Sequence, residues 1–328
     1  MHHGSGRSPD PVFRPVTAPG RELRALGYAE DPIARPLTYP GRRPPGSGLL
    51  VDGCFLDLRV TPPPPVTPPP ARPRGRPVPV AADAGASPAT PPAPQPPPGH
   101  WVLDASAVPP HVFGGAEVPL DEALRACGRP VMADRRPVLA VGSNASPAQI
   151  ARKLAGRTRP VVPMTYAHVS GLTTGASAHV SRPGYVPAVP VLAPGASTEL
   201  LVLWLDDEQL TAVDRTEPNY HRVRPPAPVT VALPGLGPLG CHLYAGRHGC
   251  LTDAGGVPIR LAGQPDLLAG LLAASPRLVR LTGARTPEEF VARTRADARL
   301  RDDVRRLWRQ EGIVLDQPEL VPGHPTAP

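Results

Sequence analysis

A block of prolines between Pro62 and Pro98 restricts what this chain can fold into more than any other feature. Proline carries no backbone N–H, and the block holds few large apolar side chains, so it cannot build a packed, hydrogen-bonded core. The chain has 52 prolines in 328 residues, and many of them lie here. We therefore predict that residues 62–99 form a disordered or polyproline II linker. A protein partner that binds this proline-rich segment is an alternative to a plain spacer.

The sequence on either side of this linker holds only local signals. Residues 1–61 are predicted to be an N-terminal extension, in which two apolar runs flank Asp52-Gly53, a typical hairpin turn. Because an isolated hairpin is barely stable in water, it either packs on the main domain or frays. Residues 100–136 are predicted to be a lead-in segment that packs on the core and contains a short helix around residues 121–127.

The segment from Val138 to Leu154 predicts a strand, a glycine-containing loop and a helix in direct succession. The apolar run 138–141 ends at Gly142-Ser143-Asn144, and Ser146-Pro147 with Gln149 three residues after Ser146 predicts a capped helix start. Free backbone N–H groups at such a helix start can hold a carboxylate or a developing oxyanion. On geometry alone, a simple turn between strand and helix is the alternative.

A second segment, from Leu200 to Val223, ends in a carboxylate at the terminus of an element. An apolar run of strand length, 200–205, leads to Asp206, a predicted helix cap. Pro218 disfavours helical geometry at Glu217, so the helix should end near that residue. A glutamate in such a place can serve as an acid or a base, or it can simply be solvated.

Together, the two segments resemble the gamma-glutamylcyclotransferase-like family. Val141-Gly142-Ser143-Asn144 corresponds to the family's first motif, a strand that ends in Tyr-Gly-Ser-Asn. Asp214-Arg215-Thr216-Glu217 with Tyr220 behind it corresponds to the second motif, and Tyr244 lies on what resembles the last core strand. The resemblance covers about residues 137–250. The chain departs from it at Val141, where the family has tyrosine, at Ala145 and at Pro218.

The resemblance implies an α+β fold, a small and largely antiparallel β-barrel with flanking helices. It also implies an intramolecular acyl transfer in which a gamma-glutamyl compound closes to 5-oxoproline and releases an amine or an amino acid. This reaction needs no metal and no cofactor. The resemblance assigns Glu217 as the general acid/base, and it assigns substrate binding to Val141, Gly142, Ser143, Asn144, Tyr220 and Tyr244. The alternative is a catalytically inactive binding or interaction module on the same fold.

Residues 251–328 are predicted to be a C-terminal helical extension. The leucines between Leu267 and Leu272 have helical spacing, and Ser275-Pro276 closes that helix. The pattern Thr286-Pro287-Glu288-Glu289 predicts a second capped helix that runs to about Gln310. These helices are expected to pack on the core, and a homodimer built through them is left open.

Charge and composition exclude several partners. The net charge is +7, but the arginines are spread along the chain among acidic residues, and aromatic residues are only 4% of the sequence, so we expect no nucleic-acid binding. The four cysteines are far apart and form no C-x-x-C pair, which argues against a metal site and favours free buried thiols. No apolar run approaches the ~18 residues of a membrane span, so we expect a cytoplasmic protein without a membrane partner.

Overall fold

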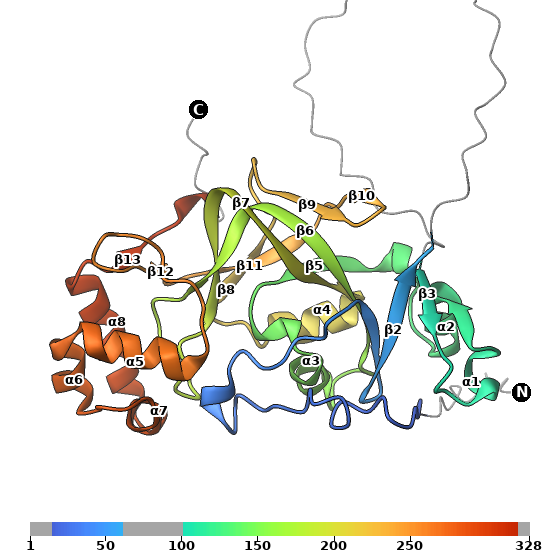
Figure 1. Ribbon diagram of the computed structural model, residues 1–328, viewed down its shortest axis with the longest axis horizontal. Helices are drawn as coiled ribbons and strands as arrows, with labels where there is room; N and C mark the ends of the chain where they lie inside the picture. The colour runs from blue at the N-terminus through green and yellow to red at the C-terminus, as the bar shows by residue number, and fades with distance from the viewer. Residues whose placement is uncertain (1–14, 62–100, 321–328) are drawn as a thin grey trace, which may run out of the picture.

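The computed structural model describes residues 15–61 and 101–320. The predicted proline-rich linker, residues 62–99, lies outside the described residues. The fold is mixed α/β: a large sheet crosses the molecule, α3 and α4 lie against it, and the last four helices gather at one end (Figure 1). The α-helices of the described residues are α1 (Pro110–Phe113), α2 (Leu120–Ala126), α3 (Pro147–Leu154), α4 (Asp207–Asp214), α5 (Gln264–Ala274), α6 (Pro276–Thr282), α7 (Pro287–Ala296) and α8 (Ala298–Gln310).

Most of the strands belong to one sheet whose pairing is largely antiparallel, and β12 pairs with β13 apart from it. Along its main path the order is β4-β3-β2-β1-β6-β7-β5-β11-β8, and a short pair, β9 with β10, attaches to β6. The strands are β1 (Gly48–Val51), β2 (Cys54–Val60), β3 (Trp101–Asp104), β4 (Glu117–Pro119), β5 (Arg136–Ala140), β6 (Val161–Ala176), β7 (Ala188–Leu205), β8 (Tyr220–Val223), β9 (Thr230–Leu233), β10 (Gly237–Pro238), β11 (His242–Gly246), β12 (Cys250–Leu251) and β13 (Val314–Leu315).

The expectation of a small closed barrel is wrong for the part of the chain that the structure describes. Strands β4 and β8 end the path and do not pair with each other. The edge of β6 that faces away from β7 is not free to close a barrel. It pairs with β1 at Val161–Met164 and with β9 at His168–Ser170. The sheet therefore extends sideways through β1 to β4 instead of closing on itself.

The hairpin expected around Asp52-Gly53 is present and belongs to the main sheet. Asp52 and Gly53 have φ angles of 47° and 87°, as a tight turn between β1 and β2 requires. β1 then pairs with β6, and β2 pairs with β3, so sequence from before residue 62 and after residue 100 builds one continuous sheet. The domain boundaries drawn from the sequence remain a prediction.

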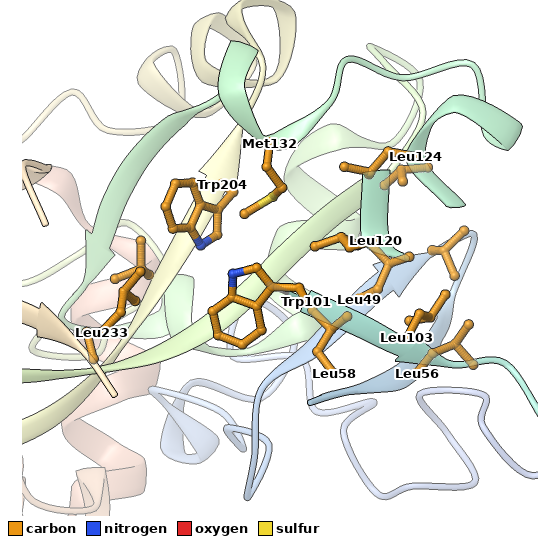
Figure 2. Packing of buried hydrophobic residues seen from close by; sticks show 14 of the residues in the cluster. Leu49, Leu56, Leu58, Trp101, Leu103, Leu120, Leu124, Met132, Trp204 and Leu233 are labelled. Atoms are coloured by element: carbon orange, nitrogen blue, oxygen red, sulfur yellow. The ribbon is translucent and has the colours of Figure 1, made fainter. Parts of the chain in front are cut away.

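Apolar side chains from the hairpin, the lead-in segment and the sheet share one core (Figure 2). Trp101 of β3 and Trp204 of β7 are both buried there, and Nε1 of Trp204 donates to Oγ1 of Thr165 at 2.8 Å. A separate core forms between the C-terminal helices around Phe290 and Trp308, which are fully buried. All four cysteines are free and buried.

Two local helix predictions differ from the structure. α3 begins at Pro147 as predicted, but the Ser146 side chain caps nothing; its hydroxyl is buried without a partner among the described residues. The helix predicted to run to Gln310 is interrupted at Asp297, whose carboxylate accepts from the backbone N–H groups of Arg299 and Leu300 and so starts α8 anew. The cap predicted at Asp206 is present, as a capping box with Gln209.

Within the described ranges, no helix combines the length and apolarity that crossing a bilayer would take.

Candidate functional site

The loop after β5 brings its backbone into close contact with two other segments. Ser143–Ala145 form a single 3-10 turn that leads into α3. A Cβ atom added to Gly142 would lie 2.7 Å from Cβ of Ala188 and 2.7 Å from the hydroxyl oxygen of Tyr39. Only glycine allows this approach, so the loop is held against β7 and against a residue from before β1.

Glu217 lies on the turn that follows α4, and its carboxylate points into the molecule. Its side chain is only 11% exposed. Oε1 accepts a hydrogen bond from Nδ2 of Asn144 at 3.0 Å and another from Nζ of Lys153 at 2.5 Å. Lys153 also donates to Oδ1 of Asn144 at 2.7 Å, which closes a triangle of three side chains. The two sequence motifs therefore meet through their own polar groups.

Lys153 was missed by the sequence reasoning. It lies near the C-terminal end of α3 and is the only lysine in a chain that otherwise uses arginine. Its position two turns into the helix that follows Gly142-Ser143-Asn144 was a usable signal, because residues on the loop-facing side of that helix can reach back to Asn144.

The two predicted tyrosines flank the same carboxylate, and each hydroxyl has a fixed partner. Tyr220 donates to the backbone oxygen of Ala188 at 2.8 Å, and Tyr244 donates to Oδ1 of Asp214 at 2.7 Å. Burial raises the pKa of both phenols well above the usual value, and the Asp214 carboxylate raises that of Tyr244 further. Both hydroxyls are therefore neutral donors at any physiological pH.

All seven predicted site residues line one small cavity of about 40 Å³. They are Val141, Gly142, Ser143, Asn144, Glu217, Tyr220 and Tyr244. Val141 contributes only an apolar wall. A much larger cavity, about 840 Å³, adjoins the small one and shares Tyr39, Ser143, Glu217 and Tyr220 with it. A ligand lying across both would have Glu217 at the junction.

Tyr39 is the second residue that the sequence reasoning missed. It follows a 3-10 turn, Pro36–Thr38, in a segment where no periodic pattern pointed to the site. Its ring stacks on Tyr185 with centroids 4.1 Å apart, and its hydroxyl accepts from the backbone N–H of Ala188 at 2.8 Å. In Figure 1 the blue segment before β1 passes along the side of the molecule that holds α3 and reaches the C-terminal helices.

The wall of the larger cavity is strongly cationic. Its charged residues are Glu217 and five cations, namely Arg152, Lys153, Arg157, Arg182 and Arg295. Lys153 is paired with Glu217, and Arg152 is paired with Asp31 at 3.0 Å. Within the described ranges, the other three arginines form no ion pair, so this cavity favours ligands that carry negative charge.

A buried histidine forms part of the same wall. His179 is 5% exposed, and its Nδ1 lies 2.7 Å from Oγ of Ser177. Burial is the main cause that lowers the pKa of His179 to about 3, and His248 and Arg305 lower it further. The imidazole is therefore neutral at physiological pH and works as a hydrogen-bonding and packing group.

Comparison with solved structures returns chains that are similar over a third of this sequence. One is described as gamma-glutamyl cyclotransferase, with 17% identity over 34% of this chain and 66% of its own length, and a TM-score of 0.27. Over this third of its length, the chain resembles gamma-glutamyl cyclotransferase. The Arabidopsis thaliana protein At3g28950.1 has 19% identity over 34% and 62%, with a TM-score of 0.27. The uncharacterized Homo sapiens protein loc79017 has 17% identity over 34% and 66%, with a TM-score of 0.28.

The chain thus spans 62% of the length of the Arabidopsis structure and 66% of the other two. Comparison of the sequence with models of known protein families gives no match, and comparison with curated proteins gives none. Similarity at these TM-scores says nothing about activity, so a function has to come from the residues around Glu217.

Proposed function

We propose that this chain is a gamma-glutamyl cyclotransferase-type enzyme with Glu217 as its general acid/base. The observation that carries the proposal is the carboxylate of Glu217, which is mostly buried at the junction of two cavities and bonded to Asn144. A carboxylate in this position can reach a ligand held in the small cavity, while the larger cavity leaves room for a leaving group.

The reaction needs one proton carrier and a set of fixed donors. The α-amino nitrogen of the substrate attacks its own γ-carbonyl carbon, and the ring of 5-oxoproline closes as the bond to the leaving nitrogen breaks. Glu217 takes a proton from the attacking nitrogen and delivers it to the leaving nitrogen, a service that contributes about 10²–10⁴-fold. Fixed N–H and O–H donors near Gly142 and Ser143 stabilise the tetrahedral oxyanion, where one lost donor costs roughly 3–4 kcal/mol.

Lys153 determines which carboxylate oxygen of Glu217 is free to exchange a proton with a substrate. Its ammonium group holds Oε1, whereas Oε2 accepts no hydrogen bond from the described residues. A substrate ammonium can therefore approach Oε2 while Lys153 and Asn144 keep the carboxylate oriented. In this scheme Lys153 is a positioning residue, and the proton passes through the oxygen that it leaves free.

The positive charge on the wall of the larger cavity predicts which gamma-glutamyl compounds react fastest. Arg157, Arg182 and Arg295 surround the space that a leaving group would fill, and no described carboxylate pairs with them. We therefore expect gamma-glutamyl amino acids and acidic gamma-glutamyl peptides to react faster than gamma-glutamyl derivatives of cationic amines.

The test is release of 5-oxoproline, measured by mass spectrometry on a panel of gamma-glutamyl compounds. Glu217→Gln keeps the shape of the side chain and removes the base, so turnover should fall at least about 100-fold. Glu208→Gln is the matched control, because Glu208 sits on α4 and contacts Arg129 and Thr158 outside both cavities. Equal turnover by Glu217→Gln and wild type would refute the proposal.

One observation favours a second candidate function, a binding module without turnover. The Lys153 ammonium already satisfies Glu217 at 2.5 Å, which is how a purely structural ion pair would look. A binding module would bind 5-oxoproline or an uncleaved gamma-glutamyl compound, as measured by calorimetry. It would form no product from any member of the panel.

A further inference from the structure

Tyr39 reaches the candidate site from sequence that lies about a hundred residues before the Gly142 loop. It is 4% exposed, and its side chain lines both cavities. The 3-10 turn before it, Pro36–Thr38, packs against α5 and α7, and Arg295 of α7 donates to the backbone oxygen of Ala34. The ring is thus fixed by the stack on Tyr185 and by contacts of the surrounding segment with the C-terminal helices.

The hydroxyl oxygen of Tyr39 accepts a hydrogen bond from the backbone at the site. The N–H of Ala188 donates to it at 2.8 Å. Gly142 lies directly beside this oxygen, where any side chain would collide with it. The N–H of Ala188, a residue that lines the small cavity, therefore acts on the phenol oxygen.

The proton of this hydroxyl is available to a ligand. A phenol oxygen that accepts a hydrogen bond still carries its own O–H donor, and no described residue accepts it. Burial, the neighbouring Tyr185 ring and the Glu217 charge raise the pKa of Tyr39, so the group remains a neutral donor. Hydrogen bonds accepted by a hydroxyl polarise its own O–H bond and make it a stronger donor.

We propose that Tyr39 is a substrate-contacting residue whose O–H donates to an oxygen of the glutamyl group in the small cavity. Val141, which precedes Gly142 and also lines the small cavity, carries no hydroxyl, so its side chain cannot donate a hydrogen bond to the ligand. The hydrogen bond from the Ala188 amide polarises the Tyr39 hydroxyl, which then donates to the ligand. This inference rests on the proposed function and adds a residue from outside the motif-bearing segment to it.

The alternative role for Tyr39 is that of a plug, a side chain that blocks the small cavity and has to move away before a ligand binds. The two readings predict changes of opposite sign when the hydroxyl is removed. A donor raises turnover and affinity, so its loss lowers both. A plug restrains them, so its loss leaves both unchanged or raises them.

The experiment compares Tyr39→Phe with Tyr166→Phe in the full chain. Both substitutions remove one phenol hydroxyl and keep the ring. Tyr166 donates to the backbone oxygen of Pro44 at 2.6 Å, so it anchors the same N-terminal segment but lies outside both cavities of the site. For Tyr39→Phe we expect kcat/KM to fall about 10–100-fold, as loss of a hydrogen bond to a charged or developing-charge group does. For Tyr166→Phe we expect a change of less than about 3-fold.

Affinity for 5-oxoproline, measured by calorimetry, gives a second readout that does not depend on turnover. Tyr39→Phe should bind this product at least about 5-fold more weakly, and its thermal unfolding midpoint should match that of Tyr166→Phe. Equal or higher turnover and affinity in Tyr39→Phe overturn the inference in favour of a plug.

Failure of the proposed function is distinguishable from failure of this inference. If the wild type binds 5-oxoproline but produces none from any gamma-glutamyl compound, the enzymatic proposal fails. The affinity of Tyr39→Phe for 5-oxoproline then still decides the role of Tyr39. If the wild type neither binds 5-oxoproline nor produces it, both are overturned.

Discussion

The Nζ atom of Lys153 lies 2.5 Å from Oε1 of Glu217, and Asn144 bridges the same two groups. The pair is 16% and 11% exposed, so solvent screens it far less than a surface ion pair. Replacing Lys153 by methionine keeps most of the side-chain volume and removes the donor. We expect kcat to fall about 10-fold or more in steady-state assays, with KM nearly unchanged, because the carboxylate loses the group that orients it.

Lys153→Arg is the control for charge. Arginine retains the positive charge but presents a planar guanidinium instead of a compact ammonium, so activity should recover only in part. Full activity in both Lys153→Met and Lys153→Arg would contradict a positioning role.

Gly142→Ala tests the close approach of the loop to its neighbours. The new Cβ would meet Cβ of Ala188 and the Tyr39 hydroxyl at 2.7 Å each, so the loop or Tyr39 has to move. We expect a loss of about 1–3 kcal/mol in the free energy of unfolding, measured with urea, together with loss of turnover. Gly270→Ala in α5 is the matched control, because nothing lies within 4 Å of the added Cβ and alanine favours the helix.

Arg135 supports the fold behind the site. Its buried guanidinium donates to the backbone oxygen of Trp204 at 2.8 Å and to Oε1 of Gln209 at 3.1 Å, and burial lowers its pKa to about 10. Arg135→Met removes both hydrogen bonds from the buried interior and should cost about 3 kcal/mol of unfolding free energy. The neighbouring Arg136 is 51% exposed, so Arg136→Met should change stability by less than about 0.5 kcal/mol.

His179 makes stability depend on pH. In the unfolded chain a histidine takes up a proton near pH 6.5, whereas burial holds the pKa of His179 at about 3 in the folded protein. The unfolded state therefore binds more protons between these values, and stability falls as the pH drops below about 6.5. From pH 6.5 to pH 5 the loss should be on the order of 2 kcal/mol, read from urea midpoints.

His179→Gln should flatten this pH dependence, because glutamine does not titrate and its amide can still bond Ser177. His168→Gln is the control: His168 is 57% exposed, and its replacement should leave the slope as in the wild type. An unchanged slope in His179→Gln would assign the pH dependence to other groups.

Local chemistry predicted many of the elements but not how they join. Asp206 is the predicted helix cap, and it forms a capping box with Gln209, because both side chains lie where their backbone partners are free. Ser146 has the same pattern but is turned away and buried, so the helix begins without its cap. The closed barrel was wrong because the edge of β6 pairs with β1, and that pairing joins residues more than a hundred positions apart. No local pattern encodes such a contact.

Because local patterns do not encode long-range contacts, only some residues of the candidate site could be predicted from the sequence. Gly142, Asn144 and Glu217 could be named because they lie in the two segments that resemble the gamma-glutamylcyclotransferase-like family. Lys153 sits inside a helix and Tyr39 in an aperiodic segment, so only the folded chain brings them to the carboxylate. The roles of the named residues stay predictions until the variants are measured.

The pairing of β1 with β6 has a practical consequence for anyone who wishes to study residues 137–250 alone. Cutting there removes Gly48–Val51, whose backbone covers Val161–Met164, and it leaves that stretch of β6 with open N–H and C=O groups beside apolar side chains. An uncovered strand edge of this kind is a template for self-association. The excised fragment should therefore aggregate, and it would also lack Tyr39.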